Sequence, residues 1–293
     1  MSATGHDKAL VAIGALDGRL AGHPLEPAWA CRRRISSAIH AAALDGLKVD
    51  PDRLGRLIAG LPLERHLDGG AESSALAIHA VLSDPTEPVG AFLPHVREVT
   101  FRGVCKAAVS ASEAGLSRSS AHAAFPFVLH RLGLTERVLV GVSPLGSADP
   151  FDVLTTTAVQ GRQALDVLSM SWDIWIARLG DRRSTSRHLE ALTVVASMGT
   201  ASPAVVARIL GMTERGAAFL LAELADLGVL REVTGRRGSW KVFVCIDHAI
   251  GAGEGGVPSR PRAKVPDLSS LFADVDRAIA SVTRKLGTSN VTD

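Results

Sequence analysis

Apolar side chains recur at the spacing of one helix face over most of the first 180 residues. Residues 84–90, with Pro85 and Pro88, interrupt this pattern and are predicted to form a loop. The β-prone run at 137–150 is predicted to be a short strand or an extended connector. The remaining pattern predicts helices over residues 7–20, 27–42, 51–58, 72–82 and 151–179. Residues 1–180 are therefore expected to form a helical domain, and the polar segment 180–186 is the expected domain boundary.

Residues 187–248 carry a more specific pattern. With Pro203 as the first position of a helix-turn-helix, Ala207 falls where the two helices cross and Gly211 falls in the turn. A first helix is expected at 189–198. The positions that must be apolar for the second helix to pack across the first are all apolar: Val206, Leu210, Met212, Ala217 and Leu220.

The polar residues around these helices agree with that assignment. Ser202 and Thr213 are good N-caps, and Gly228 is placed to end the third helix. Two β-prone runs follow, at 229–233 and 241–246, joined by a turn with two glycines and two arginines. The pattern predicts a short β-hairpin wing, so the expected fold is mainly α with a C-terminal winged helix-turn-helix.

A helix of this kind enters the major groove of duplex DNA, and the third helix is the one placed to do so. Of its outward residues, Thr213, Arg215 and Phe219 are the predicted groove contacts, because Arg215 can bind guanine and Phe219 can touch a thymine methyl. Phosphate contacts are predicted for the wing: Arg236, Arg237 and Lys241. The expected partner is double-stranded DNA, and the expected role is transcriptional control.

Two alternatives stay open. The outward face is poor in hydrogen-bonding groups, and residues 181–247 hold nine basic and seven acidic residues, a net charge of only +2. Winged-helix domains also serve as protein-interaction modules, and such a face suits that use. An enzyme with an unrecognised site in residues 1–180 is the other alternative. A polar pocket near Trp172 and Trp175 would favour it.

A weaker echo of the helix-turn-helix pattern lies at 107–127. Gly115 takes the turn position and Ala111 the crossing position, but Ser110 stands where an apolar residue is needed. Pro126 is expected to break the second helix near its end. A helical hairpin packed in the core is the preferred interpretation, and a second helix-turn-helix stays open.

The chain beyond the wing divides in two. Residues 249–266 are rich in glycine and proline and are predicted to be a flexible basic linker. Residues 267–287 are predicted to form an amphipathic helix with a two-heptad seam: Phe272, Val275, Ile279, Val282 and Leu286. Two heptads are too short to stand alone, so this helix must dock on its own chain or pair with a second copy. Homodimer pairing is the hypothesis.

Composition narrows the function classes. The 293 residues include 46% hydrophobic and 4% aromatic residues, so a core of alanine, leucine and valine is expected. Three widely spaced cysteines indicate neither a disulfide framework nor a metal site, and no run is long enough to span a membrane. No phosphate loop, zinc helix or nucleophile elbow occurs. The expectation is a cytoplasmic protein that is not an enzyme and has no catalytic residue, cofactor or metal.

The closing segment, LGVLREVTGRRGSWKVFVCID, and the opening LDGRLAGHPLEPAWACR together resemble an uncharacterised family of rhizobial and related alphaproteobacterial proteins. That resemblance implies a helical N-terminal domain of unknown role followed by a DNA-binding helix-turn-helix. The closing segment is also similar to the winged helix that follows the catalytic domain in many Fic proteins. The Fic catalytic motif HPFxDGNGR has no counterpart in this sequence, so only the winged helix is implied and nucleotide transfer is not.

Overall fold

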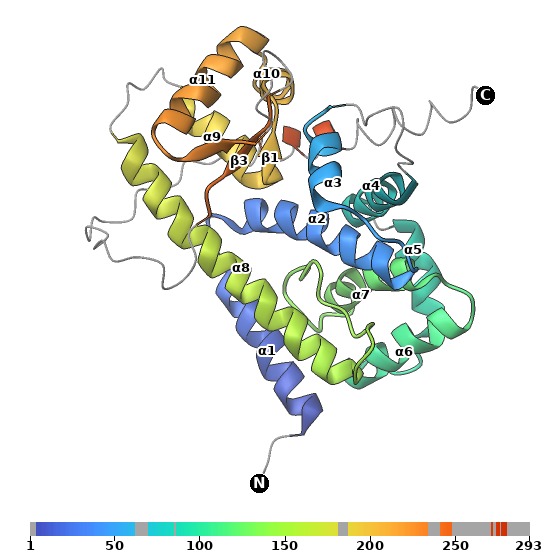
Figure 1. Ribbon diagram of the computed structural model, residues 1–293. Coiled ribbons are helices and arrows are strands. Elements are labelled where there is room, and N and C mark those ends of the chain that lie inside the picture. Colours follow the sequence, from blue (N-terminus) through green and yellow to red (C-terminus); the bar gives the residue numbers. More distant parts are fainter. Residues whose placement is uncertain are drawn as a thin grey trace, which may run out of the picture. The chain divides into compact units, whose positions relative to one another are not determined.

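The computed structural model describes residues 4–61, 70–84, 86–180, 187–233 and 241–247, together with residues 271, 274, 275 and 277–279. Helices make up most of this part of the chain, and a small three-stranded sheet is the β-structure found within it (Figure 1). The prediction of a mainly helical protein is confirmed. The chain divides into two compact units, one of residues 1–26, 33–50 and 68–164, the other of residues 27–32, 51–67 and 165–293.

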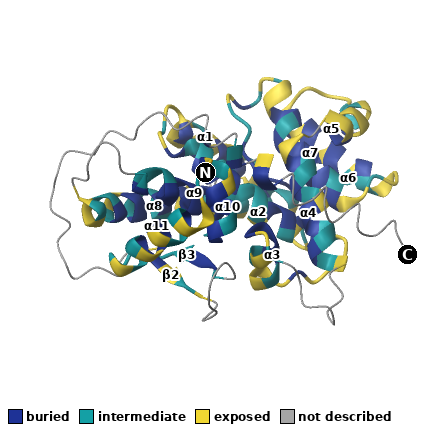
Figure 2. Cartoon of the chain, turned by 90° about the horizontal axis from the view of Figure 1, so that it is seen from above, coloured by how far each residue is buried: buried dark blue, intermediate teal, exposed yellow. Residues whose placement is uncertain are grey.

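The first unit is helical throughout its described elements. It contains α1 (Gly5–Leu20), most of α2 (Glu26–Leu44), α4 (Gly70–Ser83), α5 (Thr86–Phe92), the short 3-10 helix η1 (Leu93–His95), α6 (Phe101–Glu113), α7 (Arg118–Arg131) and the first half of α8 (Pro150–Leu179). Helix α7 contacts α4, α5 and α6. Its residues from Ala121 to Pro126 are all buried, so α7 is the helix around which this unit packs (Figure 2).

This burial bears on the second helix-turn-helix pattern. Helices α6 and α7 are joined by a tight turn in which Gly115 has φ = 103°, and Ser117 caps α7. A helix that is buried nearly all round cannot lie in a DNA groove, which favours the core hairpin. The expectation that Pro126 breaks the helix was wrong, because α7 continues to Arg131. Its packing against three other helices compensates for the lost backbone hydrogen bond.

The loop predicted at 84–90 was also wrong, since α5 begins at Thr86. The Asp84 carboxylate accepts hydrogen bonds from the backbone N–H and the hydroxyl of Thr86, at 3.4 and 2.7 Å. Pro88 lies in the first turn of α5, where its missing N–H has no helical partner to lose. Proline here supports the start of a helix that the sequence pattern assigned to a loop.

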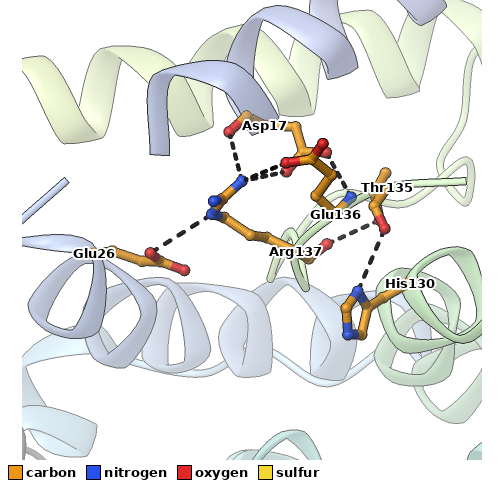
Figure 3. A network of polar contacts seen from close by, with 6 residues as sticks. All are labelled: Asp17, Glu26, His130, Thr135, Glu136 and Arg137. Atoms are coloured by element: carbon orange, nitrogen blue, oxygen red, sulfur yellow. Dashed lines mark hydrogen bonds and ion pairs between the residues drawn. The ribbon is translucent and has the colours of Figure 1, made fainter. Parts of the chain in front are cut away.

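Residues 137–149 form a connector of turns and bends, with the Val142 N–H donating to the Leu139 carbonyl at 3.0 Å. The predicted strand does not form there, and the connector is not extended as the alternative expected. A polar network ties its beginning to α1 (Figure 3). The Arg137 guanidinium lies 3.5 Å from the Asp17 carboxylate, 3.8 Å from that of Glu26 and 3.3 Å from that of Glu136. The Glu136 backbone N–H also donates to Asp17 at 2.8 Å. Burial raises the pKa of Glu26, and the nearby Arg137 opposes that effect.

The second unit contains α9 (His188–Met198), β1 (Thr200–Ala201), α10 (Pro203–Leu210), α11 (Glu214–Asp226), β2 (Leu230–Glu232) and β3 (Phe243–Cys245). The strands are antiparallel in the order β1-β3-β2, with Thr200 opposite Val244 and Leu230 opposite Cys245. Helix α9 contacts α10, α11, β1 and β3. Its residues 191–198 are all buried, so α9 forms the base on which the other elements pack.

This unit is larger than the predicted domain 187–248. It also includes α3 (Pro51–Ile58), residues 27–32 of α2 and the second half of α8 from Leu165. The predicted boundary at residue 180 was placed by composition, because 180–186 is polar. Helix α8 runs unbroken for 30 residues, so no proline or turn marks the point where it passes from one unit to the other.

The predicted linker 249–266 lies outside the described residues, as do Phe272, Val282 and Leu286 of the predicted seam. The two seam residues that are described, Val275 and Ile279, are helical and fully buried within the single chain. This burial favours docking on the chain itself over pairing with a second copy, the two alternatives that the heptad pattern left open. No helix of the described part of the chain is long and apolar enough to cross a membrane.

Candidate nucleic-acid interface

Four residues at predicted positions set the two ends of α10 and the start of α11. Ser202 caps α10, its hydroxyl accepting a hydrogen bond from the Val205 N–H at 3.3 Å, and Pro203 occupies the first helical position. Gly211 ends α10 in the left-handed conformation, with φ = 61° and ψ = 42°. Thr213 then caps α11 by accepting from the Gly216 N–H at 3.2 Å. Each of these sequence predictions is confirmed.

The apolar positions of the pattern pack as expected. The side chains of Val206, Leu210, Ala217 and Leu220 are buried, and Ala207 at the helix crossing is only 5% exposed. Helices α10 and α11 contact each other directly, and both contact α9. Met212 is half-buried, with its terminal methyl near Gly216. One face of α11 is therefore held against the unit, which leaves the opposite face open.

That open face begins with the first turn of α11. Thr213, Glu214 and Arg215 are exposed, and the Phe219 side chain is 63% exposed one turn later. An exposed phenylalanine on a helix is an apolar surface without cover from its own chain. Arg215 and Phe219 are four residues apart, so they lie on the same side of the helix. Arg215 and Phe219 thus share one exposed surface, while Thr213 lies at the start of the helix and its hydroxyl accepts the capping bond.

The hairpin differs in part from its prediction. Strands β2 and β3 form where the two β-prone runs predicted them, and a further bond from the Val233 N–H to the Val242 carbonyl at 2.9 Å extends the ladder. Lys241, predicted as a phosphate contact, has its ammonium 2.7 Å from the Glu232 carboxylate. Because this ion pair holds the Lys241 ammonium within the hairpin, Lys241 is not a free cation of the surface. Arg236 and Arg237 lie outside the described residues.

One side-chain contact that the sequence did not predict holds the buried face of α11 against α9. His188, at the start of α9, contacts the Glu223 carboxylate of α11 through its Nε2 atom. The His188 side chain is 8% exposed, so the contact lies inside the unit. Its two residues are 35 positions apart, and nothing in the local pattern pairs them.

A second unpredicted anchor holds the end of β3. The Arg32 guanidinium donates two hydrogen bonds to the Asp247 carboxylate, at 3.1 and 2.9 Å, and one to the Ala196 carbonyl. It also lies 6.0 Å from the centre of the Trp175 ring. The Trp175 indole N–H donates to the Ile246 carbonyl at 3.0 Å. Arg32 is the first of three successive arginines, residues 32–34, and it forms an ion pair with Asp247.

The surroundings of Trp172 and Trp175 bear on the polar pocket that would favour an enzyme. The Trp175 side chain is fully buried, and that of Trp172 is 3% exposed. The two rings pack edge to face with their centres 6.4 Å apart. The tryptophans are core residues of the second unit, and the observation that would have favoured an enzyme is not made there.

Ala59 and Gly60, which follow α3, lie against the beginning of α10. The Ser202 hydroxyl donates to the Ala59 carbonyl at 2.5 Å, in addition to its capping role. Gly60 and Gly55 allow close approach, since a Cβ at these positions would lie 3.1 Å from Val205 and 3.3 Å from Thr200. Ser202 and Pro203 are buried as a result. The N-terminus of α10 is therefore closed to a phosphate, and α11 with the hairpin is the open part of this surface.

One serine–histidine pair in the first unit has the residue types of an activated nucleophile. The Ser37 hydroxyl lies 2.9 Å from His122 Nε2, and the His40 ring centre is 5.2 Å from that of His122. Ser37 and His122 are only 3% and 1% exposed, so a substrate cannot reach the hydroxyl. Burial, with His40 and Arg33 nearby, lowers the pKa of His122 to about 3 and keeps the ring neutral. The pair is a core contact. No group of side chains in the described residues could hold a metal ion.

No protein-family model and no curated protein matches this chain. The resemblance to the alphaproteobacterial family and to the winged helix of Fic proteins therefore stays a prediction. The proposed function therefore rests on the structure of the second unit.

Proposed function

We propose that residues 187–247 form a winged helix-turn-helix that binds duplex DNA, and that the chain is a transcriptional regulator. Support comes from the order α9-β1-α10-α11-β2-β3, in which a helix pair on a glycine turn is followed by an antiparallel hairpin. This order of elements is typical of winged-helix domains, in which the second helix of the pair enters the major groove.

The observation that carries the proposal is the open face of α11. Its first turn and Phe219 are exposed while the opposite face is buried against α9 and α10. A major groove admits one helix, and an exposed arginine on that helix can bind the O6 and N7 atoms of guanine together. Phe219, one turn further on, would then lie against a thymine methyl. The face offers few other hydrogen-bonding groups, so specific reading is confined to a small number of base pairs.

The experiment uses the full chain and fluorescence anisotropy on two duplexes, one enriched from a random pool by binding and one of random sequence. We expect Arg215→Ala to weaken binding to the enriched duplex about tenfold and to change binding to the random duplex little, because a base contact carries sequence information. Replacing Arg236 and Arg237 together by alanine should weaken binding to both duplexes. It should also reduce the slope of log affinity against log salt concentration by about two.

The matched control is Arg162→Ala, which removes an exposed arginine of α8 in the other compact unit. It should leave both affinities unchanged. No binding to either duplex at low salt, or an equal loss for Arg162→Ala and Arg215→Ala, would contradict the proposal.

A protein-interaction module is the second candidate, and the 63% exposure of Phe219 is the observation that favours it. Aromatic side chains are enriched at the centres of protein interfaces. The same experiment separates the two functions, since a protein-interaction surface gives no salt-dependent binding to DNA.

A further inference from the structure

The first unit contains a cavity of about 400 Å³ that the proposed function does not use. It lies between the end of η1, the segment 96–100 and the first three turns of α6. Its lining includes His95, Arg97, Glu98, Gly103, Lys106 and Ser110. Cavities that bind small molecules typically measure about 300–1,000 Å³.

The backbone around this cavity is held in place by α6. Thr100 caps the helix, its hydroxyl accepting from the Gly103 N–H at 3.0 Å. The Glu98 carbonyl lies so close to α6 that a Cβ on residue 103 would be 2.3 Å from it. Only glycine permits that approach, so the segment 96–100 can fold back over the first turn of the helix. The cavity wall is therefore a defined part of the structure.

The charges around the cavity are unbalanced. Arg97 and Lys106 are exposed, and neither makes an ion pair with any residue of the described part of the chain. Glu98 is the one carboxylate of the lining, so two permanent cations face one anion there. An arginine and a lysine that line the same concave surface favour a phosphate or a carboxylate.

We propose that this cavity binds a small organic anion, a phosphate or carboxylate that also carries a hydroxyl or amino group. Arg97 and Lys106 bind the anionic group, and the Glu98 carboxylate accepts a hydrogen bond from the donor group of the same ligand. The Ser110 hydroxyl is a further partner at the rim. A purely inorganic anion satisfies the two cations but is repelled by Glu98.

Isothermal titration of the full chain tests this, with glycerol 3-phosphate, inorganic phosphate and glycerol as the probes. We expect glycerol 3-phosphate to bind with a Kd of about 1 mM or tighter, inorganic phosphate more weakly and glycerol not at all. Arg97→Ala and Lys106→Ala should each weaken the binding of glycerol 3-phosphate about tenfold, because each removes a charge-assisted hydrogen bond. Arg102→Ala, an exposed arginine of α6 outside the lining, is the matched control and should change nothing.

Glu98→Gln separates the role of the donor group from that of the anion. This substitution should tighten the binding of inorganic phosphate, because the negative charge that repels the anion is removed. It should reduce the preference for glycerol 3-phosphate, because the carboxylate that accepts the hydrogen bond of the hydroxyl is lost as well. The proposal is overturned if none of the probes binds at about 10 mM, if Arg102→Ala loses as much as Arg97→Ala, or if Glu98→Gln leaves the preference unchanged. DNA does not enter this experiment, so its outcome is independent of the proposed function.

Discussion

Replacing Arg32 by alanine lowers the free energy of unfolding by about 2–3 kcal/mol, the largest expected effect of a single substitution outside the apolar core. The guanidinium joins α2 to the Ala196 carbonyl at the end of α9 and to Asp247 after β3. Its loss leaves a part-buried carbonyl without its donor and opens a space beside Trp175. The ion pair contributes the smaller share, because the Asp247 side chain is 44% exposed.

Urea unfolding followed by tryptophan fluorescence measures this effect, since Trp175 lies beside the substituted residue. Arg118→Ala is the control, because Arg118 also donates to a backbone carbonyl, that of Gly146 at 3.0 Å, but at an exposed position. We expect that control to cost less than about 0.5 kcal/mol. Equal costs for the two variants would show that the Arg32 anchor adds nothing beyond a surface hydrogen bond.

The second large effect is a loss of stability in acid that comes from His122. Its pKa is lowered from 6.5 to about 3 in the folded protein, chiefly by burial and further by the neighbouring His40 and Arg33. Between these two values the unfolded chain binds a proton that the folded chain does not. The free energy of unfolding therefore falls as the pH is lowered through this window, by about 1.4 kcal/mol per pH unit, or about 2 kcal/mol at pH 5.

His122→Gln isolates this contribution from that of the carboxylates. Glutamine has no proton to bind, and its amide can still meet the Ser37 hydroxyl. Thermal or urea unfolding measured from about pH 7.5 to pH 4 should give two curves that run together near neutral pH and separate below about pH 6.5, the variant being less sensitive to acid. Parallel curves over the whole range would contradict a neutral, buried His122.

Most of the α10–α11 surface could be predicted from the sequence because its signals are local. Ser202, Gly211 and Thr213 act on backbone groups within a few residues of themselves, through capping bonds and a left-handed turn. The same locality explains the failure at α5. Proline there was interpreted as a break, whereas its position in a first turn supports the helix.

Contacts between residues far apart in the chain gave no such signal. Lys241 was predicted to bind phosphate, but the register of β2 and β3 places it beside Glu232. The apolar seam of the C-terminal helix was predicted from its heptad spacing alone. That spacing does not determine which surface covers Val275 and Ile279. The cover of α10 by Ala59 and Gly60 depends on two segments that are more than 140 residues apart.

The sequence by itself determined the helical class, the bounds of α10 and α11, the turn at Gly211 and the residues that share the open face of α11. These follow from periodicity and from bonds between near neighbours in the chain. The tertiary structure decided which units those helices join, which arginine of residues 32–34 anchors β3, and where a cavity opens beside α6. Such features depend on the approach of distant segments, which packing and side-chain shape select together and which no local pattern encodes.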